Sequence, residues 1–235
     1  MIIVIGLVMG AIFISFIFFD MFTVFMNKRV SQTSADAAVL GAVQEIKTVY
    51  EESLTEQLKT EMEELEEKVE ERLEEILAII GDDEGDDEES NEDPPYDTDD
   101  KDELIKLILE DMDVPEELHC YFESPRCQLN ANAALAYFFE DIGTTSRVCQ
   151  AIGSNWSRVE QAAQYYATKN GAQDEVELIF PYRDQFAIYA AVYTEASFVT
   201  VDDASFGAGA RNVEAAAAAN IVFPEGLTFV LGSCR

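Results

Sequence analysis

The sequence predicts an α+β protein, with an N-terminal transmembrane helix that continues into a long helical stalk and then a small C-terminal domain of helices and an antiparallel sheet. Three observations predict it. The chain begins with an uncharged apolar run, a glutamate-rich stretch with helical periodicity follows, and the periodicity later falls to two. We expect an anchor over residues 1–26, a stalk over 27–80, a linker over 81–102 and a head over 103–235.

The charge is large and unevenly placed. The 235 residues include 47 acidic and 15 basic side chains, a net charge of -32, and residues 51–103 alone carry 26 acids and four bases. Nucleic-acid phosphates are bound by Lys and Arg, so we expect no nucleic-acid partner.

The N-terminal run is long enough for a membrane anchor. Residues 2–19 carry no charge, and Asp20 closes the run. If the helix continues through Met26, it is long enough to cross the bilayer at a tilt. A cleaved signal peptide is the alternative, but the run is longer than a usual signal core, with no basic flank before it and no A-x-A-like site soon after it. We therefore expect a single-pass protein of the cytoplasmic membrane, with the lipid bilayer as its first partner.

Two observations conflict over orientation. Lys28 and Arg29 follow the span and nothing basic precedes it, which by the positive-inside rule holds the C-terminal bulk in the cytoplasm. That rule weakens for long domains, and the cysteines described below favour an extracytoplasmic head.

The stalk has one apolar stripe. Its members recur through 37 residues in ten steps, a period of 3.7, at Val43, Ile46, Tyr50, Leu54, Leu58, Met62, Leu65, Val69, Leu73, Ile76 and Ile80. A heptad seam needs a period of 3.5, so we expect a straight or slightly right-handed helix that packs its stripe. Self-association of two copies through the stalk is one way to pack it. A solvated lone helix is the alternative.

The acidic linker offers no defined metal site. Residues 81–100 hold 12 acids, no bases and the pair Pro94-Pro95. Residues 82–87 do not fit the EF-hand frame of alternate acids, a Gly at six and a Glu at twelve. We expect loose cation screening there and no metal or other cofactor.

The head should contain helices first and strands later. We expect helices over residues 103–112, 130–139 and 155–169, the last one ending at Asn170-Gly171. Alternating apolar residues predict strands over 176–180, 186–192, 197–201, 213–222 and 227–231. The fourth contains five consecutive alanines, which favour helix on propensity.

All four cysteines lie in the head. An even number behind a membrane anchor favours disulfides, and of the three pairings we favour Cys120–Cys127, which closes a short loop, with Cys149–Cys234, which ties down the C-terminus. Reduced, packed thiols and a zinc site are the alternatives. The spacing contains no C-x-x-C and His119 is the only histidine, which disfavours zinc.

Nothing in the sequence predicts an enzyme. No Ser-His-Asp triad can be argued around His119, the only histidine, which lies beside Cys120 in a Pro-bounded loop. Adjacent His and Cys side chains point in different directions, so we expect His119 at the surface of that loop. No phosphate-binding glycine motif occurs. We therefore expect no catalytic residues.

The segment after the anchor has a distinctive spacing. Asp20 is followed at fixed distances by Gln32, Asp36, Ala37, Ala38 and Leu40. This run resembles the segment that follows the anchor in TadE/TadG-like proteins of the Flp (tight adherence) pilus system. The alanine-rich helix ending in Asn-Gly at residues 162–171, and the alanine-rich segment 213–222, are similar to features of the same family.

The resemblance implies a non-enzymatic, membrane-anchored component of pilus assembly or surface display, with other pilus-assembly or pilin-like proteins as partners. Ala37, Ala38, Gly41 and Ala42 make a smooth helix face that lets another helix approach closely, and Gln32 and Asp36 lie one turn apart. The alternatives are a pilin-like filament subunit, a cytoplasm-facing coiled-coil protein and a cation-responsive or ligand-binding head. Type IV pilins carry a Glu at mature position five, where this chain has Ile5.

Overall fold

We describe a computed structural model of the chain, which covers residues 2–82, 101–124, 126–173, 176–196 and 211–234. The predicted α+β class is confirmed: a long N-terminal helix is followed by further helices and a three-stranded antiparallel sheet. The chain forms two compact units. The first combines residues 1–50 with 150–222, and the second combines 51–149 with 223–235.

The N-terminal helix α1, Ile2–Asp82, contributes to both units. Its sequence has no proline and only four glycines, so no residue breaks the helical hydrogen bonding. The predicted apolar stripe is buried from Ile46 to Leu73. In each unit these side chains are covered by other elements of the same chain, so a stalk dimer would have to use a different face of α1.

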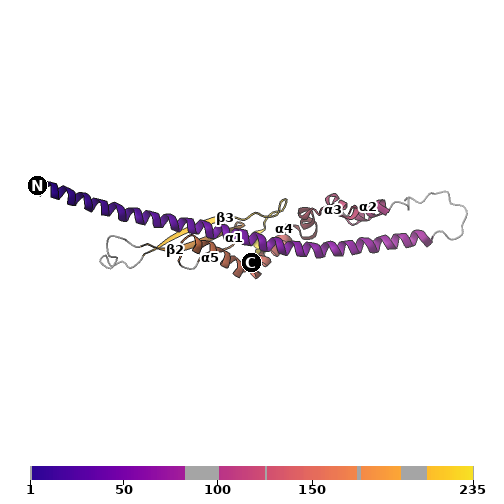
Figure 1. Cartoon of the computed structure of the whole chain (residues 1–235). Coiled ribbons are helices and arrows are strands. Elements are labelled where there is room, and N and C mark those ends of the chain that lie inside the picture. Colours follow the sequence, from indigo (N-terminus) through magenta and orange to yellow (C-terminus); the bar gives the residue numbers. More distant parts are fainter. Residues whose placement is uncertain (1, 83–100, 125, 174–175, 197–210, 235) are drawn as a thin grey trace. The chain divides into compact units, whose positions relative to one another are not determined.

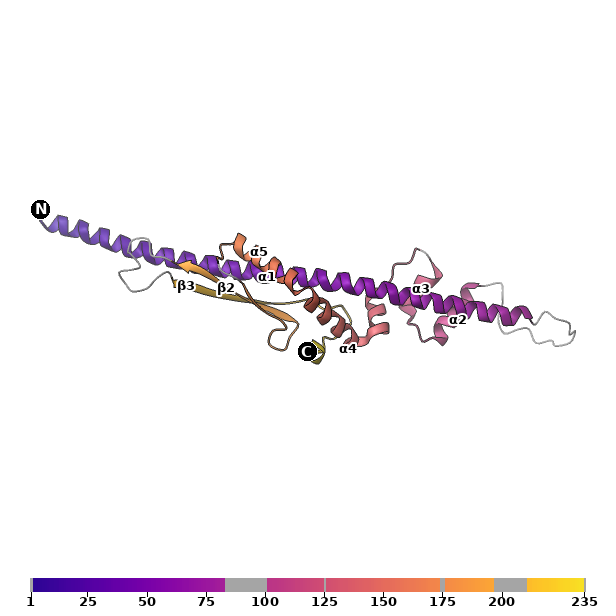
Figure 2. The same ribbon diagram turned by 90° about the horizontal axis from the view of Figure 1, so that it is seen from below.

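In the first unit, α5 and the sheet lie along α1 (Figure 1, Figure 2). Helix α5 spans Trp156–Lys169 and ends as predicted, because Gly171 adopts a φ of 101° and the Ala172 N–H bonds back to the Ala167 carbonyl. The strands are β1, Glu177–Ile179, β2, Ala187–Ala196, and β3, Arg211–Asn220. Their order is β1-β2-β3, with both pairings antiparallel.

The alanine-rich segment forms the strand β3 despite its helix propensity. It pairs with β2 through ten residues, from Ala187↔Asn220 to Ala196↔Arg211. Ladder hydrogen bonds of that number outweigh propensity differences of a few tenths of a kcal/mol per residue. The first two predicted strands correspond to β1 and β2, while the predicted strand 197–201 and most of the linker, residues 83–100, lie outside the described residues.

In the second unit, α2, Lys101–Asp111, confirms the first predicted helix of the head, and α3, Glu116–Glu123, was not predicted. Helix α4, Ala131–Ser154, begins where expected, with the Asn130 side chain accepting from the Ala133 N–H, but it extends past the predicted end. It bends at Glu140, whose φ is 53° and ψ is -173°. Helix α4 also supplies its last residues to the first unit.

The predicted strand at 227–231 is wrong. This segment has no strand pairing and leads into a short 3₁₀ helix, Leu231–Cys234. Its backbone is satisfied by side chains of α4 instead, because the Thr228 N–H donates to Asp141 Oδ1 at 2.8 Å and the Val230 N–H donates to Thr145 Oγ1 at 3.1 Å. Alternating Leu227, Phe229 and Leu231 therefore imitate a strand without forming one.

The prediction of a surface His119 is also wrong. His119 is 6% exposed and lies in α3, and its Nε2 is 2.8 Å from the Val114 carbonyl oxygen. The short helix turns the imidazole inward, where this hydrogen bond offsets the cost of burying a polar ring.

Candidate functional site

The first part of α1 is an apolar helix that no described part of the chain covers. Every described side chain from Ile3 to Val30 is exposed or half-buried, including Ile3 at 79% and Phe13 at 65%. An 18-residue window of this helix has a mean hydropathy of 2.5 and contains no buried residue. The core helix of a soluble protein would be mostly buried, so this segment has the length and composition of a membrane span.

One residue later the same helix enters the packed unit. Ser31 and Ser34 are completely buried. The Ser31 hydroxyl donates to the Val213 carbonyl of β3 at 3.0 Å, and the Ser34 hydroxyl lies 2.6 Å from the Asn170 carbonyl at the end of α5. These bonds join the helix to the sheet and to α5 directly after the apolar segment ends.

A face of small residues on α1 receives α5. Ala35, Ala38 and Ala42 have no exposed surface. A Cβ added at Gly41 would collide with the Tyr166 ring and would lie 3.2 Å from the Ala162 carbonyl oxygen. The small residues let a helix approach closely here, and this helix belongs to the same chain.

An ion pair reinforces the same contact. Nε and Nη2 of Arg158, near the start of α5, both lie 2.8 Å from Glu45 Oε1 on α1. Since both side chains remain partly exposed, the pair contributes no more than about 1 kcal/mol. Helix α5 runs antiparallel to α1, since Arg158 near its start meets Glu45 and Asn170 after its end meets Ser34.

The motif residues divide between two faces of α1. The Gln32 side chain donates to Asp36 Oδ1 at 3.2 Å, as the spacing suggested, and also lies 3.4 Å from the Ala216 carbonyl oxygen of β3. Ala38 is buried and Ala37 half-buried, whereas Asp36 is exposed. The buried side of the motif, Ala37 and Ala38, therefore packs against other elements of the same chain.

Two further motif residues take no part in that packing. Leu40 is 64% exposed on α1, and Asp20 lies within the apolar segment before the packed part of the helix begins. The structure does not bring either of them to the small-residue face.

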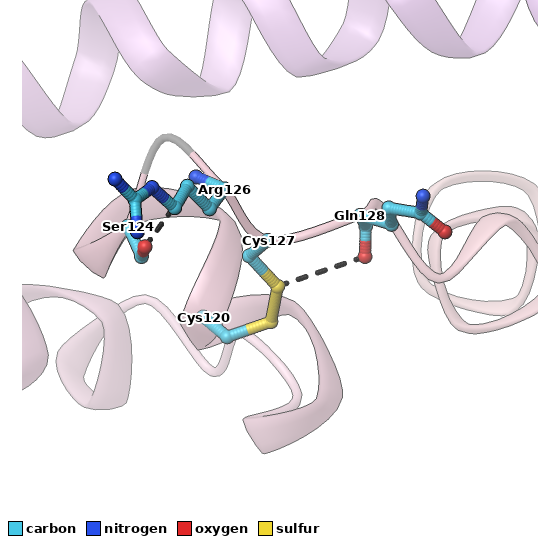
Figure 3. The surroundings of a disulfide bond; sticks show 5 residues. All are labelled: Cys120, Ser124, Arg126, Cys127 and Gln128. Carbon is cyan, nitrogen blue, oxygen red and sulfur yellow. Dashed lines mark hydrogen bonds between the residues drawn. A yellow bond between two sulfur atoms is a disulfide. The ribbon is translucent and has the colours of Figure 1, made fainter.

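Both favoured disulfides are present. Cys120 pairs with Cys127, with 5.8 Å between their Cα atoms, and Cys149 pairs with Cys234, with 5.3 Å. Both separations are normal for a disulfide. Figure 3 shows the first of these bonds and its short loop, in which the Cys127 N–H donates to the Ser124 carbonyl at 3.0 Å.

The disulfides remove the thiol chemistry weighed from the sequence. Cys120 is oxidised, so it cannot act as a nucleophile with the adjacent His119. Within the described ranges no cysteine is free, and no three His, Cys, Asp or Glu side chains gather as a metal site would require.

An uncovered apolar helix followed by a disulfide-bonded portion is consistent with a membrane-anchored, extracytoplasmic protein. The helix that packs on the small-residue face, the Ala-rich helix ending at Asn170-Gly171, was expected from the sequence. Its pairing with Gly41 was not, because it joins residues more than 120 positions apart. No protein-family model, no curated protein and no solved structure matches this chain.

Proposed function

We propose that this chain is a non-enzymatic, membrane-anchored component of Flp/Tad-type pilus assembly or surface display, with its disulfide-bonded part outside the cytoplasm. The observation that carries the anchoring is the uncovered apolar segment of α1. Nineteen large apolar side chains between Ile3 and Val30 are exposed. At about 1.5–3 kcal/mol for each, their hydration would cost on the order of 30 kcal/mol, more than the usual net stability of a domain.

A bilayer accounts for the length of this segment. The 24 residues from Ile3 to Met26 rise about 36 Å as a helix, which spans a hydrocarbon core of about 30 Å with a modest tilt. Lys28 and Arg29 then fall at the interface, where long basic side chains are stable.

The disulfides support an extracytoplasmic position, because structural disulfides persist in oxidising compartments. Lys28 and Arg29 argue for the opposite orientation by the positive-inside rule. That rule acts on short flanking loops, however, and the region after Arg29 is a long folded chain.

The pilus role rests on the motif around Gln32 and Asp36. In this proposal the buried side of the motif, Ala37 and Ala38, holds the folded part rigidly at the membrane surface. Asp36 and Leu40 then remain on the open side of α1, where another pilus-assembly or pilin-like protein would meet the chain.

The anchoring is tested by extracting membranes with alkaline carbonate. We expect the chain to stay in the membrane pellet. The variant Ile12→Arg/Phe16→Arg should move to the soluble fraction, since each Arg costs about 2.5–3.5 kcal/mol at the centre of a span. Leu40→Arg, an exposed position outside the span, is the matched control and should stay in the pellet. Release of the unmodified chain would overturn the anchoring.

The pilus role needs its own test. Deleting the gene should abolish surface pili seen by electron microscopy, while the chain itself stays with the membrane when cells are sheared. Wild-type numbers of pili after deletion would refute the pilus role and leave the anchoring untouched.

A pilin-like filament subunit is the second candidate, favoured by one observation. The bare apolar helix continues without a break into the packed part of α1, as the core helix of a filament must. Recovery of the chain in the sheared filament fraction would favour this function over an assembly component.

A further inference from the structure

The two faces of the sheet in the first unit differ in exposure. Side chains alternate along a strand, and on β2 the residues Ile188, Ala190 and Val192 are completely buried on one side. Tyr189 and Tyr193 project to the other side and are partly exposed. We call this side the outer face. The strand pairing adds to it Glu177 and Ile179 from β1, and Glu214, Ala216 and Ala218 from β3.

The outer face has exposed apolar residues on its two outer strands, whereas Ala187 and Ala191 of the middle strand β2 are only 3% and 1% exposed. Ile179 is 42% exposed, Ala218 is exposed and Ala216 is half-buried. The alanines are too small to cover the tyrosine rings, so a partner can approach the sheet closely.

Carboxylates flank one of the two tyrosines. Tyr193 is the register partner of Glu214 on β3, and Glu177 on β1 is the register partner of Ala191, two positions from Tyr193 on the same face. Both glutamates are exposed. The Glu214 charge, followed by partial burial and the Glu177 charge, raises the pKa of Tyr193. The ring therefore lies in a negative potential supplied from both neighbouring strands.

A third tyrosine, Tyr182, covers Tyr189 and carries a cation of the same chain. Tyr182 stacks on Tyr189 with 4.9 Å between ring centroids, and the Arg183 guanidinium lies 5.0 Å from the Tyr182 centroid. A cation of the chain itself thus occupies this end of the tyrosine row. None of the cation–aromatic contacts among the described side chains, a set that leaves out Arg211, involves Tyr193.

We propose that the outer face docks a basic segment of a partner polypeptide, with an Arg or Lys side chain over the Tyr193 ring and between Glu177 and Glu214. Charge complementarity selects the cation, and an aromatic ring face attracts it further. The exposed apolar side chains on β1 and β3 favour a polypeptide, because a small cation alone would leave Ile179 and Ala218 uncovered. The inference deepens the proposed function by naming the chemistry of a partner.

The test is a binding measurement on the purified full chain in a neutral detergent at 0.15 M salt. The probe is fluorescein-labelled hexaarginine, followed by fluorescence anisotropy. Because residues 51–103 are strongly acidic and attract any polycation, a charge-matched control is required. Glu177→Gln/Glu214→Gln is compared with Glu70→Gln/Glu71→Gln, which removes two exposed charges from α1.

We expect the outer-face double variant to weaken binding at least fivefold and the α1 double variant to weaken it less than twofold. Tyr193→Leu keeps every charge and should weaken binding about threefold. Unchanged melting temperatures will show that the exposed substitutions leave the fold intact. Equal weakening by the two double variants, or no effect of Tyr193→Leu, would overturn the proposal. The assay needs no membrane, so its failure is separate from a failure of the anchoring test.

Discussion

Gly41 is where α1 and α5 approach most closely, so enlarging it should destabilise the first unit. In Gly41→Val the new Cβ would overlap the Tyr166 ring and crowd the Ala162 carbonyl oxygen, a backbone atom that cannot rotate away. Overpacking of this kind costs about 3 kcal/mol, and the better helix propensity of Val returns only a few tenths. We expect a net loss of about 2–3 kcal/mol.

The matched control is Gly153→Val. Gly153 is an exposed helical glycine in the same unit, and a Cβ there has no neighbour within 4 Å. Its stability should change by less than about 0.5 kcal/mol. Thermal unfolding of the full chain in detergent, followed by near-UV circular dichroism, should give a melting temperature about 5–10 °C lower for Gly41→Val than for the control.

A second substitution isolates the cause. Removing the ring in Gly41→Val/Tyr166→Ala should recover at least about 1 kcal/mol of the loss relative to Tyr166→Ala alone, since residues in contact are coupled. The reasoning would be refuted if Gly41→Val had the same melting temperature as Gly153→Val, because α1 and α5 would then not be in close contact.

Three further predictions concern bonds outside that contact. Replacing both cysteines of Cys149–Cys234 by Ser should lower the free energy of unfolding by about 4.6 kcal/mol, and replacing those of Cys120–Cys127 by about 2.5 kcal/mol. The difference arises because the two bonds close loops of different length, with sequence separations of 85 and seven residues. Urea unfolding compares the two double variants, and equal losses of stability would contradict the entropic account. Tyr50→Phe removes a buried 2.6 Å hydrogen bond to the Val222 carbonyl and should cost about 1 kcal/mol, while an unchanged urea midpoint would mean that the bond is absent. Burial, and then the Asp113 charge, raise the pKa of Tyr137, so the folded state favours the neutral phenol. The stability that this group contributes is present below pH 10 and should be lost as the pH rises through the folded-state pKa. Between pH 9 and pH 11 the free energy of unfolding should therefore fall less for Tyr137→Phe than for the unmodified chain.

The parts of the fold that depend on local signals could be predicted. The end of α5 is fixed by Asn170-Gly171, where only a residue that tolerates positive φ continues the chain at low cost. The stripe from Ile46 to Leu73 is similarly visible, since helical spacing alone puts those side chains on one face.

The features that were missed depend on tertiary partners. The second half of α4 contains Gly143, Thr144 and Thr145, which favour a turn, yet both threonines are fully buried and Thr145 accepts from the C-terminal segment. The same bond keeps residues 227–231 from pairing as a strand. Burial of His119 likewise depends on the Val114 carbonyl five residues away, once the short helix α3 has formed.

The candidate site was predictable in kind but not in partner. The small residues Ala38, Gly41 and Ala42 predicted a close helix contact, and the hydropathy of residues 2–26 predicted the apolar segment. Which helix would fill the contact is decided by packing between segments far apart in sequence, and no local pattern records it.

The central claim is that the folded part lies outside a membrane crossed by α1. Labelling intact spheroplasts with a membrane-impermeant amine reagent tests it directly, with mass spectrometry of the exposed lysines Lys59, Lys106 and Lys169. The account predicts that all three are modified before lysis, while a cytoplasmic control protein is not. Modification of these lysines only after lysis would place the folded part in the cytoplasm and contradict the account.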